Sequence, residues 1–173
     1  MKFYSGFSLK NDEHFFKDYI KDSEYTVSGF SYGAIKAFRY VKKQVEMSKR
    51  VDTLQLFSPA FFQTKSSKFK RLQTLAYSKN SDAYLVQFID GCFSPYKKIE
   101  IEHSEHNLDE LEELLNFEWV IPELQVIVDK GIAVEVYLGS EDRIIDVEHA
   151  RKLFLDVATV TYIKNANHFL QIQ

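Results

Sequence analysis

The segment Gly-Phe-Ser-Tyr-Gly at positions 29–33 constrains the fold of this chain more than any other feature of its sequence. It follows a short β-like run, residues 25–28, and it opens a helical pattern that continues from Ala34. A Gly-x-Ser-x-Gly segment between a strand and a helix is typical of a nucleophile elbow, a sharp turn that projects a serine hydroxyl above the edge of a sheet. The glycines leave room for so tight a turn. The pattern therefore predicts that Ser31 is a nucleophile.

Two later motifs supply the partners that a serine nucleophile needs, in the order acid and then histidine. The predicted strand at 133–138 runs into a loop that contains Asp142, and the predicted strand at 159–163 runs into a loop that contains His168. Because the carboxyl ends of parallel strands meet at one edge of a sheet, the two loops are expected to converge. We predict that Ser31 attacks, that His168 removes and returns its proton, and that Asp142 orients the imidazole.

The identity of the acid leaves two rivals open, because Glu141 and Asp146 lie in the same loop. Asp146 is placed to act as the N-cap of the following helix, which favours Asp142 as the partner of the histidine.

A second Ser-Gly-Phe-Ser sequence occurs at 5–8, directly after the first predicted strand. It cannot be the elbow, because Lys10 stands where the closing glycine would be. Loops of this kind can supply one N–H of an oxyanion hole, and the residue after the nucleophile supplies the other. Those donors would be the backbone amides of Phe7 and Tyr32; an ordinary turn between a strand and a helix explains the segment equally well.

Composition limits the remaining classes of function. The 173 residues are 45% hydrophobic, which is enough for one domain over 1–173 with a sizeable core. A net charge of −3 gives no nucleic-acid signature, and no apolar run approaches the roughly 18 residues of a membrane helix. No signal peptide is visible, and the single cysteine, Cys92, fits a reducing compartment. We expect a cytoplasmic protein that binds neither nucleic acid nor membrane.

A metal site is not expected. His103 and His106 lie in a run rich in glutamate, but the spacing matches no recognisable zinc signature. A solvated acidic segment is the favoured interpretation.

Strands and helices alternate along the chain, which predicts an α/β fold with about five mostly parallel strands. The strand at 2–5 should lie at the edge of the sheet, beside the strand at 25–30. The expected strands are 2–5, 25–30, 53–58, 133–138 and 159–163, and the expected helices are 11–20, 32–48, 123–130 and 147–157.

Residues 61–121 interrupt the alternation and predict a helical cap inserted after the third strand. The part at 61–80 carries Lys and Arg without any acid, whereas the part at 100–118 carries eight acids and no Lys or Arg. Asn107 and Glu110 form a capping-box pattern at the start of a leucine-rich helix. Two interpretations of the charges stay open: solvated faces that pair with each other, or a basic docking surface for an acidic partner. The docking residues would be Lys65, Lys68, Lys70 and Arg71.

The elbow, acid and histidine motifs, in this order, resemble those of the α/β-hydrolases. Closer detail is similar to the pimeloyl-acyl-carrier-protein methyl ester esterases of biotin synthesis, in their short BioV-type form. Ser-Gly-Phe at 5–7 resembles the oxyanion-loop motif of that family, with serine in place of histidine. The elbow at 29–33 resembles its Gly-aromatic-Ser-x-Gly motif, and Phe-Lys-Arg-Leu-Gln-Thr at 69–74 resembles its cap motif. The segments at 139–142 and 167–168 resemble the acid and histidine motifs of the same family.

The resemblance implies a serine carboxylesterase that needs no cofactor and no metal, and whose partner is an acyl carrier protein bearing a pimeloyl methyl ester. It implies that Phe69 and Gln73 border the acyl pocket, and that Lys68 takes the place of an arginine that meets the carrier protein. The alternatives are another serine acyl hydrolase, such as a thioesterase or a short-chain esterase, or a non-catalytic binding module with the same fold.

The chain departs from the usual pattern of the family at both ends. It begins at the oxyanion strand, omits the strand and helix that normally separate this strand from the elbow, and stops five residues after His168. We therefore expect a truncated α/β-hydrolase fold.

Overall fold

The computed structural model describes residues 1–173 and contains one five-stranded sheet with the strand order β1-β3-β4-β6-β7. All four neighbouring pairs are parallel. The predicted parallel sheet is confirmed, and so is the edge position of the first strand beside the second. The strands are β1 (Lys2–Tyr4), β3 (Thr26–Phe30), β4 (Thr53–Phe57), β6 (Ala133–Gly139) and β7 (Thr159–Ile163).

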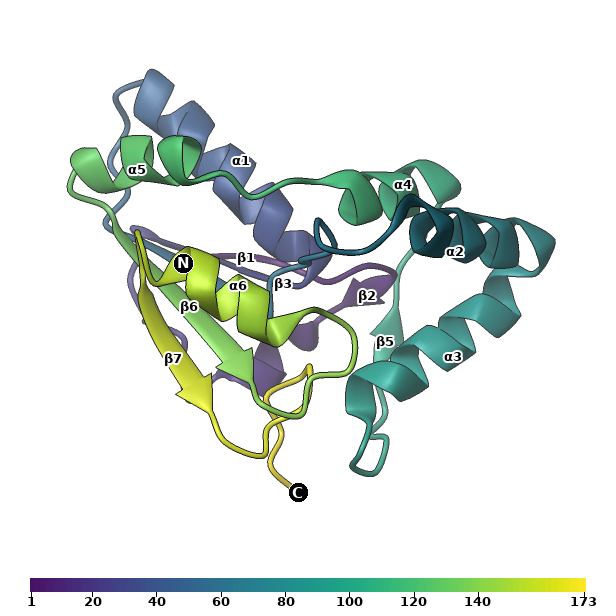
Figure 1. Cartoon of the computed structure of the whole chain (residues 1–173). Helices are drawn as coiled ribbons and strands as arrows, with labels where there is room; N and C mark the ends of the chain where they lie inside the picture. The colour runs from purple at the N-terminus through teal and green to yellow at the C-terminus, as the bar shows by residue number, and fades with distance from the viewer.

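Three helices cover one face of this sheet (Figure 1). They are α1 (Tyr32–Glu46), α5 (Ile121–Asp129) and α6 (Val147–Phe154), and each corresponds to a predicted helix with shifted ends. Each helix buries one apolar stripe, as amphipathic helices on a sheet do. The larger of the two hydrophobic clusters, with 31 buried residues, lies between these helices and the sheet and continues into the insertion after β4.

The opposite face is covered by the segment 11–20, which was predicted to be an α-helix. That prediction is wrong: only Asp12–Phe16 form a short 3₁₀ helix, η1. Its aromatic side chains pack flat on the sheet, with the Phe16 ring 4.7 Å from that of Phe57. Beyond η1, the Tyr19 carbonyl and the Lys21 N–H hydrogen bond to the side chain of Gln55 in β4, so the helix does not continue.

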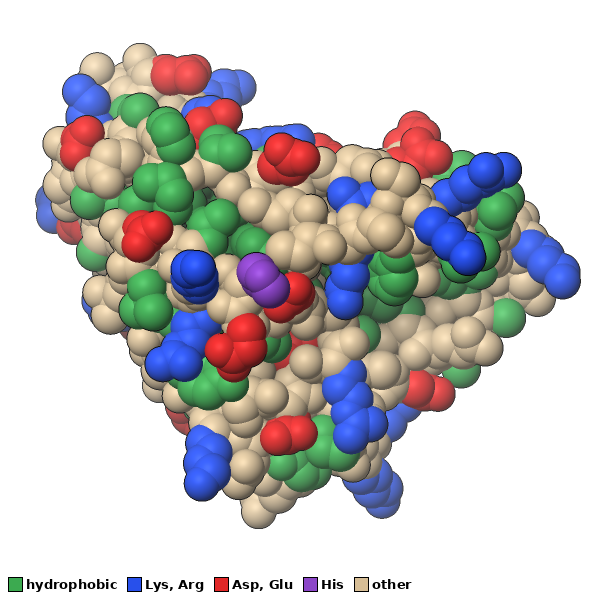
Figure 2. Space-filling view, in the orientation of Figure 1, with side chains coloured by type: hydrophobic (Ala, Val, Ile, Leu, Met, Phe, Trp, Pro, Cys, Tyr) green, Lys and Arg blue, Asp and Glu red, His purple; other side chains and the backbone are tan.

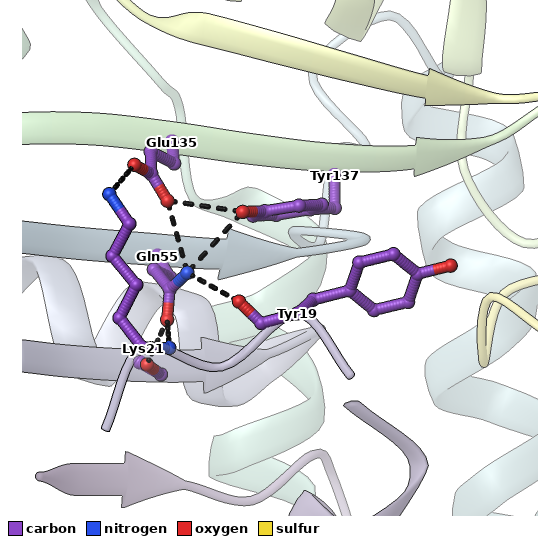
Figure 3. Close-up of polar contacts among 6 residues, drawn as sticks. Tyr19, Lys21, Gln55, Glu135 and Tyr137 are labelled. Carbon is purple, nitrogen blue, oxygen red and sulfur yellow. Dashed lines mark hydrogen bonds and ion pairs between the residues drawn. The ribbon is translucent and has the colours of Figure 1, made fainter. Parts of the chain in front are cut away.

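Polar side chains on β3, β4 and β6 form a row that hydrogen bonds to the end of this segment (Figure 3). Ser28, Gln55 and Glu135 occupy the same register position on the three strands. Gln55 Oε1 accepts the N–H of Lys21 at 3.1 Å and the Ser28 hydroxyl at 3.2 Å. Its Nε2 donates to the carbonyl of Tyr19 at 2.9 Å and to Glu135 at 3.0 Å. The completely buried amide is therefore satisfied, as buried polar groups must be.

Glu135 closes this row with an ion pair to Lys21. Burial raises the pKa of the carboxyl, but hydrogen bonds from Lys21, Gln55 and Tyr137 oppose it and hold the pKa below its ordinary value. This row of side chains therefore binds the loop after η1 to the sheet. Glu135 contributes to it as an ionised carboxylate.

The insertion between β4 and β6 forms three helices that stand to one side of the sheet (Figure 1). They are α2 (Ser67–Lys79), α3 (Ser81–Phe93) and α4 (Leu108–Asn116). Asn107 is the N-cap of α4, as predicted, because its side chain accepts the N–H of Glu110 at 2.9 Å. A two-stranded antiparallel ribbon, β2 (Leu9–Lys10) with β5 (Glu102–His103), was not predicted. None of the helices has the length and apolar character needed to cross a membrane.

Candidate active site

Ser31 lies between β3 and α1 in a strained backbone conformation, with φ 52° and ψ −114°. Three backbone hydrogen bonds hold it there. Its N–H donates to Phe57 at 2.9 Å, and its carbonyl accepts the N–H groups of Ala34 and Ala60, both at 3.1 Å. Strain of this kind persists only where the surroundings impose it, and it is frequent at functional sites.

The glycines of the elbow are required by close backbone approaches. A Cβ on Gly29 would overlap the backbone of Gly33, and a Cβ on Gly33 would overlap the carbonyl of Tyr4 at the end of β1. The first strand and the elbow therefore pack backbone against backbone, which brings the loop after β1 next to Ser31.

The structure brings the three predicted triad side chains into one hydrogen-bonded chain. His168 Nε2 lies 3.0 Å from Ser31 Oγ, and His168 Nδ1 lies 2.6 Å from Asp142 Oδ2. Since an ionised carboxylate only accepts hydrogen bonds, Nδ1 carries the proton toward Asp142, and Nε2 is left to accept the Ser31 hydroxyl. The side chains of His168 and Asp142 are completely buried, and Ser31 is 5% exposed.

Backbone donors complete the environment of the acid. Asp142 Oδ1 accepts the N–H groups of Ile144 at 2.8 Å and Ile145 at 3.3 Å. The rival Asp146 instead caps α6 by accepting the N–H of His149 at 3.3 Å. The other rival, Glu141, is exposed and forms no bond to His168. Asp142 is thus the carboxylate that meets the imidazole.

The loop that carries His168 is fixed by contacts that sequence reasoning missed. Asn167, which is completely buried, donates from Nδ2 to the carbonyl of Phe93 at 2.8 Å and accepts the N–H of Gln171 at 3.0 Å. A Cβ on Gly139 would lie within 2.5 Å of the carbonyl oxygens of Ala166 and Asn167. The only local signal for the loop was the Asn-His pair, which does not reveal that Asn167 reaches α3.

The backbone amides of Phe7 and Tyr32 are the predicted oxyanion donors, and the side chains of these two residues are in contact, with ring centroids 6.4 Å apart. The N–H of Phe7 forms no hydrogen bond within the protein. Tyr32 is the first residue of α1, where an N–H has no acceptor inside the helix. Neither amide therefore has a hydrogen-bond partner within the protein, so both stay candidates for the oxyanion hole.

A cavity of about 250 Å³ opens between the cap and the acid loop. The predicted pocket residues Phe69 and Gln73 both line it, and Gln73 Oε1 accepts the hydroxyl of Tyr84 at 3.0 Å. The triad side chains do not line this cavity, but Arg143 and Ile144, which follow Asp142 in the chain, form part of its wall. The lining residues are Phe62, Phe69, Gln73, Tyr84, Gln87, Phe88, Leu114, Leu115, Arg143 and Ile144.

The basic residues of the cap are unequally exposed. Lys68 and Arg71 are exposed on α2, whereas Lys65 and Lys70 are half-buried, and Lys65 lies 5.4 Å from the centre of the Phe69 ring. None of the four forms an ion pair. Figure 2 shows Lys and Arg side chains gathered among hydrophobic ones over this end of the molecule.

The acidic part of the cap does not pair with the basic part. Glu110 forms an ion pair with Lys36 of α1 at 3.1 Å, and Glu113 pairs with Arg39 and accepts the hydroxyl of Tyr32. The acidic helix α4 is thus fastened to the helix that follows the nucleophile, and the basic face of α2 is left free.

Nothing in the structure suggests a metal site at the remaining histidines. His106 Nδ1 lies 2.6 Å from the hydroxyl of Tyr77, and no group of three or more His, Cys, Asp or Glu side chains is arranged to hold an ion.

Comparisons with known proteins identify the fold. No family model matches the sequence, and no curated protein matches it. Among solved structures, BioG from Haemophilus influenzae matches with a TM-score of 0.57 and 13% identity, over 97% of this chain and 87% of that one. A putative hydrolase from Bacillus subtilis matches with a TM-score of 0.55 and 15% identity, over 85% of this chain and 54% of that one. Naproxen esterase (carboxylesterase NP) from Bacillus subtilis matches with a TM-score of 0.54 and 16% identity over the same shares, 85% and 54%.

This chain therefore spans about half the length of the two Bacillus structures. Likeness at such low identity is evidence of the fold alone, and a shared fold does not establish a shared activity. The protein has an α/β-hydrolase fold, as predicted.

Proposed function

We propose that the protein is a serine carboxylesterase that hydrolyses the methyl ester of pimeloyl-acyl-carrier-protein methyl ester, giving the free carboxylate for biotin synthesis. The observation that carries the catalytic part is the hydrogen-bonded chain from Asp142 through His168 to Ser31. The substrate is inferred from the motif resemblance, the cavity and the free basic face of the cap.

The proposed reaction follows from the geometry of these side chains. Ser31 Oγ attacks the ester carbonyl while His168 Nε2 takes its proton, and Asp142 stabilises the imidazolium. The carbonyl oxygen, now negative, accepts hydrogen bonds from the N–H groups of Phe7 and Tyr32. His168 returns the proton to the departing methoxy oxygen, and methanol leaves. A water molecule, deprotonated by the same imidazole, then releases the carboxylate from Ser31.

The cavity supports a medium-length acyl chain as the substrate. Its volume of about 250 Å³ leaves room for an acyl chain. Most of its lining is apolar, as for ligand sites in general, and Gln73, Gln87 and Arg143 supply polar contacts.

The basic face supports a protein-bound substrate. Acyl carrier proteins are strongly acidic, and Lys68 and Arg71 are exposed cations without ion-pair partners on α2, the helix whose Phe69 and Gln73 line the cavity. Complementary charges mainly speed the encounter of two proteins and weaken with salt. We assign the docking role to these two residues, with Lys65 and Lys70 contributing at shorter range.

A second candidate is a serine esterase for small soluble esters, because the triad and the oxyanion donors do not depend on a carrier. Two measurements separate the candidates. The first is hydrolysis of p-nitrophenyl butyrate, with Ser31→Ala as the control and a serine-reactive phosphonate as the label. The second is hydrolysis of the carrier-bound methyl ester, with rescue of a biotin auxotroph that lacks its own methyl ester esterase.

Docking of the carrier protein is tested by reversing two charges on α2. Lys68→Glu with Arg71→Glu should raise KM for the carrier-bound ester by about 10-fold or more and leave p-nitrophenyl butyrate hydrolysis unchanged. A matched control, Lys49→Glu with Lys130→Glu, makes the same change of net charge at exposed positions outside the cap. Equal effects of the two double variants would contradict docking at α2.

A further inference from the structure

A buried carboxylate next to the predicted oxyanion loop is used by neither the triad nor the cavity. Asp12 is 2% exposed, and its Oδ2 accepts the N–H of Gly6 at 3.0 Å. Its other oxygen, Oδ1, has no hydrogen-bond partner. No cation pairs with the carboxylate, and burial raises its pKa, only partly offset by hydrogen bonds from Ser5 and Gly6. Burying such a group without a cationic partner costs folding free energy, so stability alone does not account for it.

The segment that Asp12 contacts is held in an unfavourable backbone conformation. Ser8 and Asn11, neither of them glycine, have positive φ values of 61° and 58°. Such residues keep their conformation only where several contacts impose it. The carbonyl of Ser8 accepts the N–H of Ser104 at 2.9 Å from the cap side, and Asp12 holds the segment from the sheet side.

The hydrogen bonds of Gly6 determine where the Phe7 N–H points. The Gly6 N–H donates to Asp12, and the Gly6 carbonyl accepts the N–H of Leu9 at 3.1 Å. Because a trans peptide is planar, the N–H of Phe7 points opposite to the carbonyl of Gly6. The Leu9 bond orients the Gly6–Phe7 peptide, and the Asp12 bond orients the Ser5–Gly6 peptide before it; together they fix the backbone on both sides of the Gly6 Cα and hence the direction of the Phe7 N–H.

The same residue is in close contact with the elbow. A Cβ on Gly6 would lie 2.9 Å from a ring carbon of Phe30, the residue before Ser31, so the loop is already packed against the elbow. Any shift of Gly6 changes the position of the Phe7 N–H relative to Ser31 Oγ.

We propose that Asp12 is a positioning residue for the oxyanion hole: its carboxylate accepts the Gly6 N–H and thereby keeps the Phe7 N–H directed at the oxygen that becomes negative during ester hydrolysis. The inference rests on the proposed serine-esterase function. It assigns the effect to the acceptor atom and not to the charge of Asp12.

The test compares two variants of similar size on p-nitrophenyl butyrate. Asp12→Leu removes the acceptor, and its kcat should fall about 10- to 100-fold, somewhat less than the loss caused by deleting an oxyanion donor outright. KM should stay within about 2-fold, and the melting temperature should change little, because relief of the buried carboxylate is offset by the Gly6 N–H that loses its acceptor. Asp12→Asn keeps an acceptor for Gly6 and should retain kcat within about 3-fold.

A second readout separates positioning from loss of folding. The rate at which a phosphonate labels Ser31 depends on the same oxyanion donors, so it should fall in Asp12→Leu in parallel with kcat. Thr53→Val is the matched control, since it removes another buried polar group, 7% exposed, at the start of β4. It should change neither rate.

The outcomes decide between the proposal and its rivals. Unchanged kcat in Asp12→Leu overturns it, and equal losses in the Leu and Asn variants overturn it in favour of a role for the charge. A lower melting temperature, with kcat restored on cooling, makes Asp12 merely structural. If Asp12→Leu does not fold, Asp12→Asn and Asp12→Ser make the same comparison. A wild-type protein that cannot hydrolyse the ester would instead refute the proposed function itself.

Discussion

Replacing Gly139 with alanine should disable the active site without disturbing the sheet. The added Cβ would lie within 2.5 Å of the carbonyl oxygens of Ala166 and Asn167, whereas real Cβ atoms essentially never approach closer than 3.0 Å. Because both neighbours are backbone atoms, no side-chain rotation can relieve the overlap. The loop before His168 must therefore move by about half an ångström or more.

That movement bears directly on proton transfer. The bond between His168 Nε2 and Ser31 Oγ is 3.0 Å long, and lengthening it by half an ångström takes it to the outer limit of a hydrogen bond. Misplacement by about 1 Å costs on the order of 100-fold in rate, so we expect kcat to fall about 10- to 100-fold. The assay is steady-state hydrolysis of p-nitrophenyl butyrate, with far-UV circular dichroism to verify the fold.

Gly131→Ala is the control for the loss of a glycine. Gly131 has a φ of 80° and open space around its Cα, so alanine there introduces backbone strain and no steric overlap. It should lower stability by about 1 kcal/mol and leave kcat unchanged. If Gly139→Ala retains kcat within about 3-fold at an unchanged melting temperature, the close approach does not position His168, and the reasoning is refuted.

Three further predictions concern the acid, the polar row and the cap. Asp142→Asn should lower kcat about 100- to 10,000-fold because it disturbs the imidazole tautomer, whereas Asp146→Asn should leave kcat within about 2-fold; the reverse result would assign the acid to Asp146. Glu135 has a lowered pKa, so its contribution to stability is complete above its ordinary pKa of 4.5 and is lost as the pH falls through the lower folded pKa. Melting curves from pH 3 to pH 7 should therefore show a weaker loss at the acid end for Glu135→Gln than for the wild type, and parallel curves would contradict the shift. Trp119→Phe removes the 2.8 Å bond from Nε1 to the carbonyl of Ala60, and urea unfolding should show a loss of about 1–3 kcal/mol with the triad still labelled by phosphonate.

Several elements of the molecule could be predicted because their causes are local. The elbow at 29–33 needs glycine two residues before and two residues after Ser31, and this steric requirement is visible in a segment of five residues. The Asn107 cap depends on a side chain reaching an N–H three residues later, which is again a short-range pattern. The alternation of strands and helices predicted the parallel sheet, and right-handed connections placed β1 at its edge.

Local sequence patterns predicted a helix over 11–20 that the structure does not contain. Its apolar residues have helical spacing, but the sheet beneath offers Gln55 and a flat aromatic surface, and these contacts outweigh helix propensity. The ribbon of β2 and β5 was missed for a related reason. Two strands of two residues each, separated in the chain by η1, β3, α1, β4, α2 and α3, leave no periodicity to detect.

The sequence by itself determined the order and chemical types of the candidate site: a serine at a tight turn, then an acid, then a histidine. Only the tertiary structure decided which acid meets His168, that Asn167 reaches α3, that α4 pairs with α1, and that Asp12 holds Gly6. These contacts join residues that are distant in the chain or depend on how a loop packs against the elbow. Their energy arises only when the folded sheet brings the partners to one edge, and no local pattern of residues carries that information.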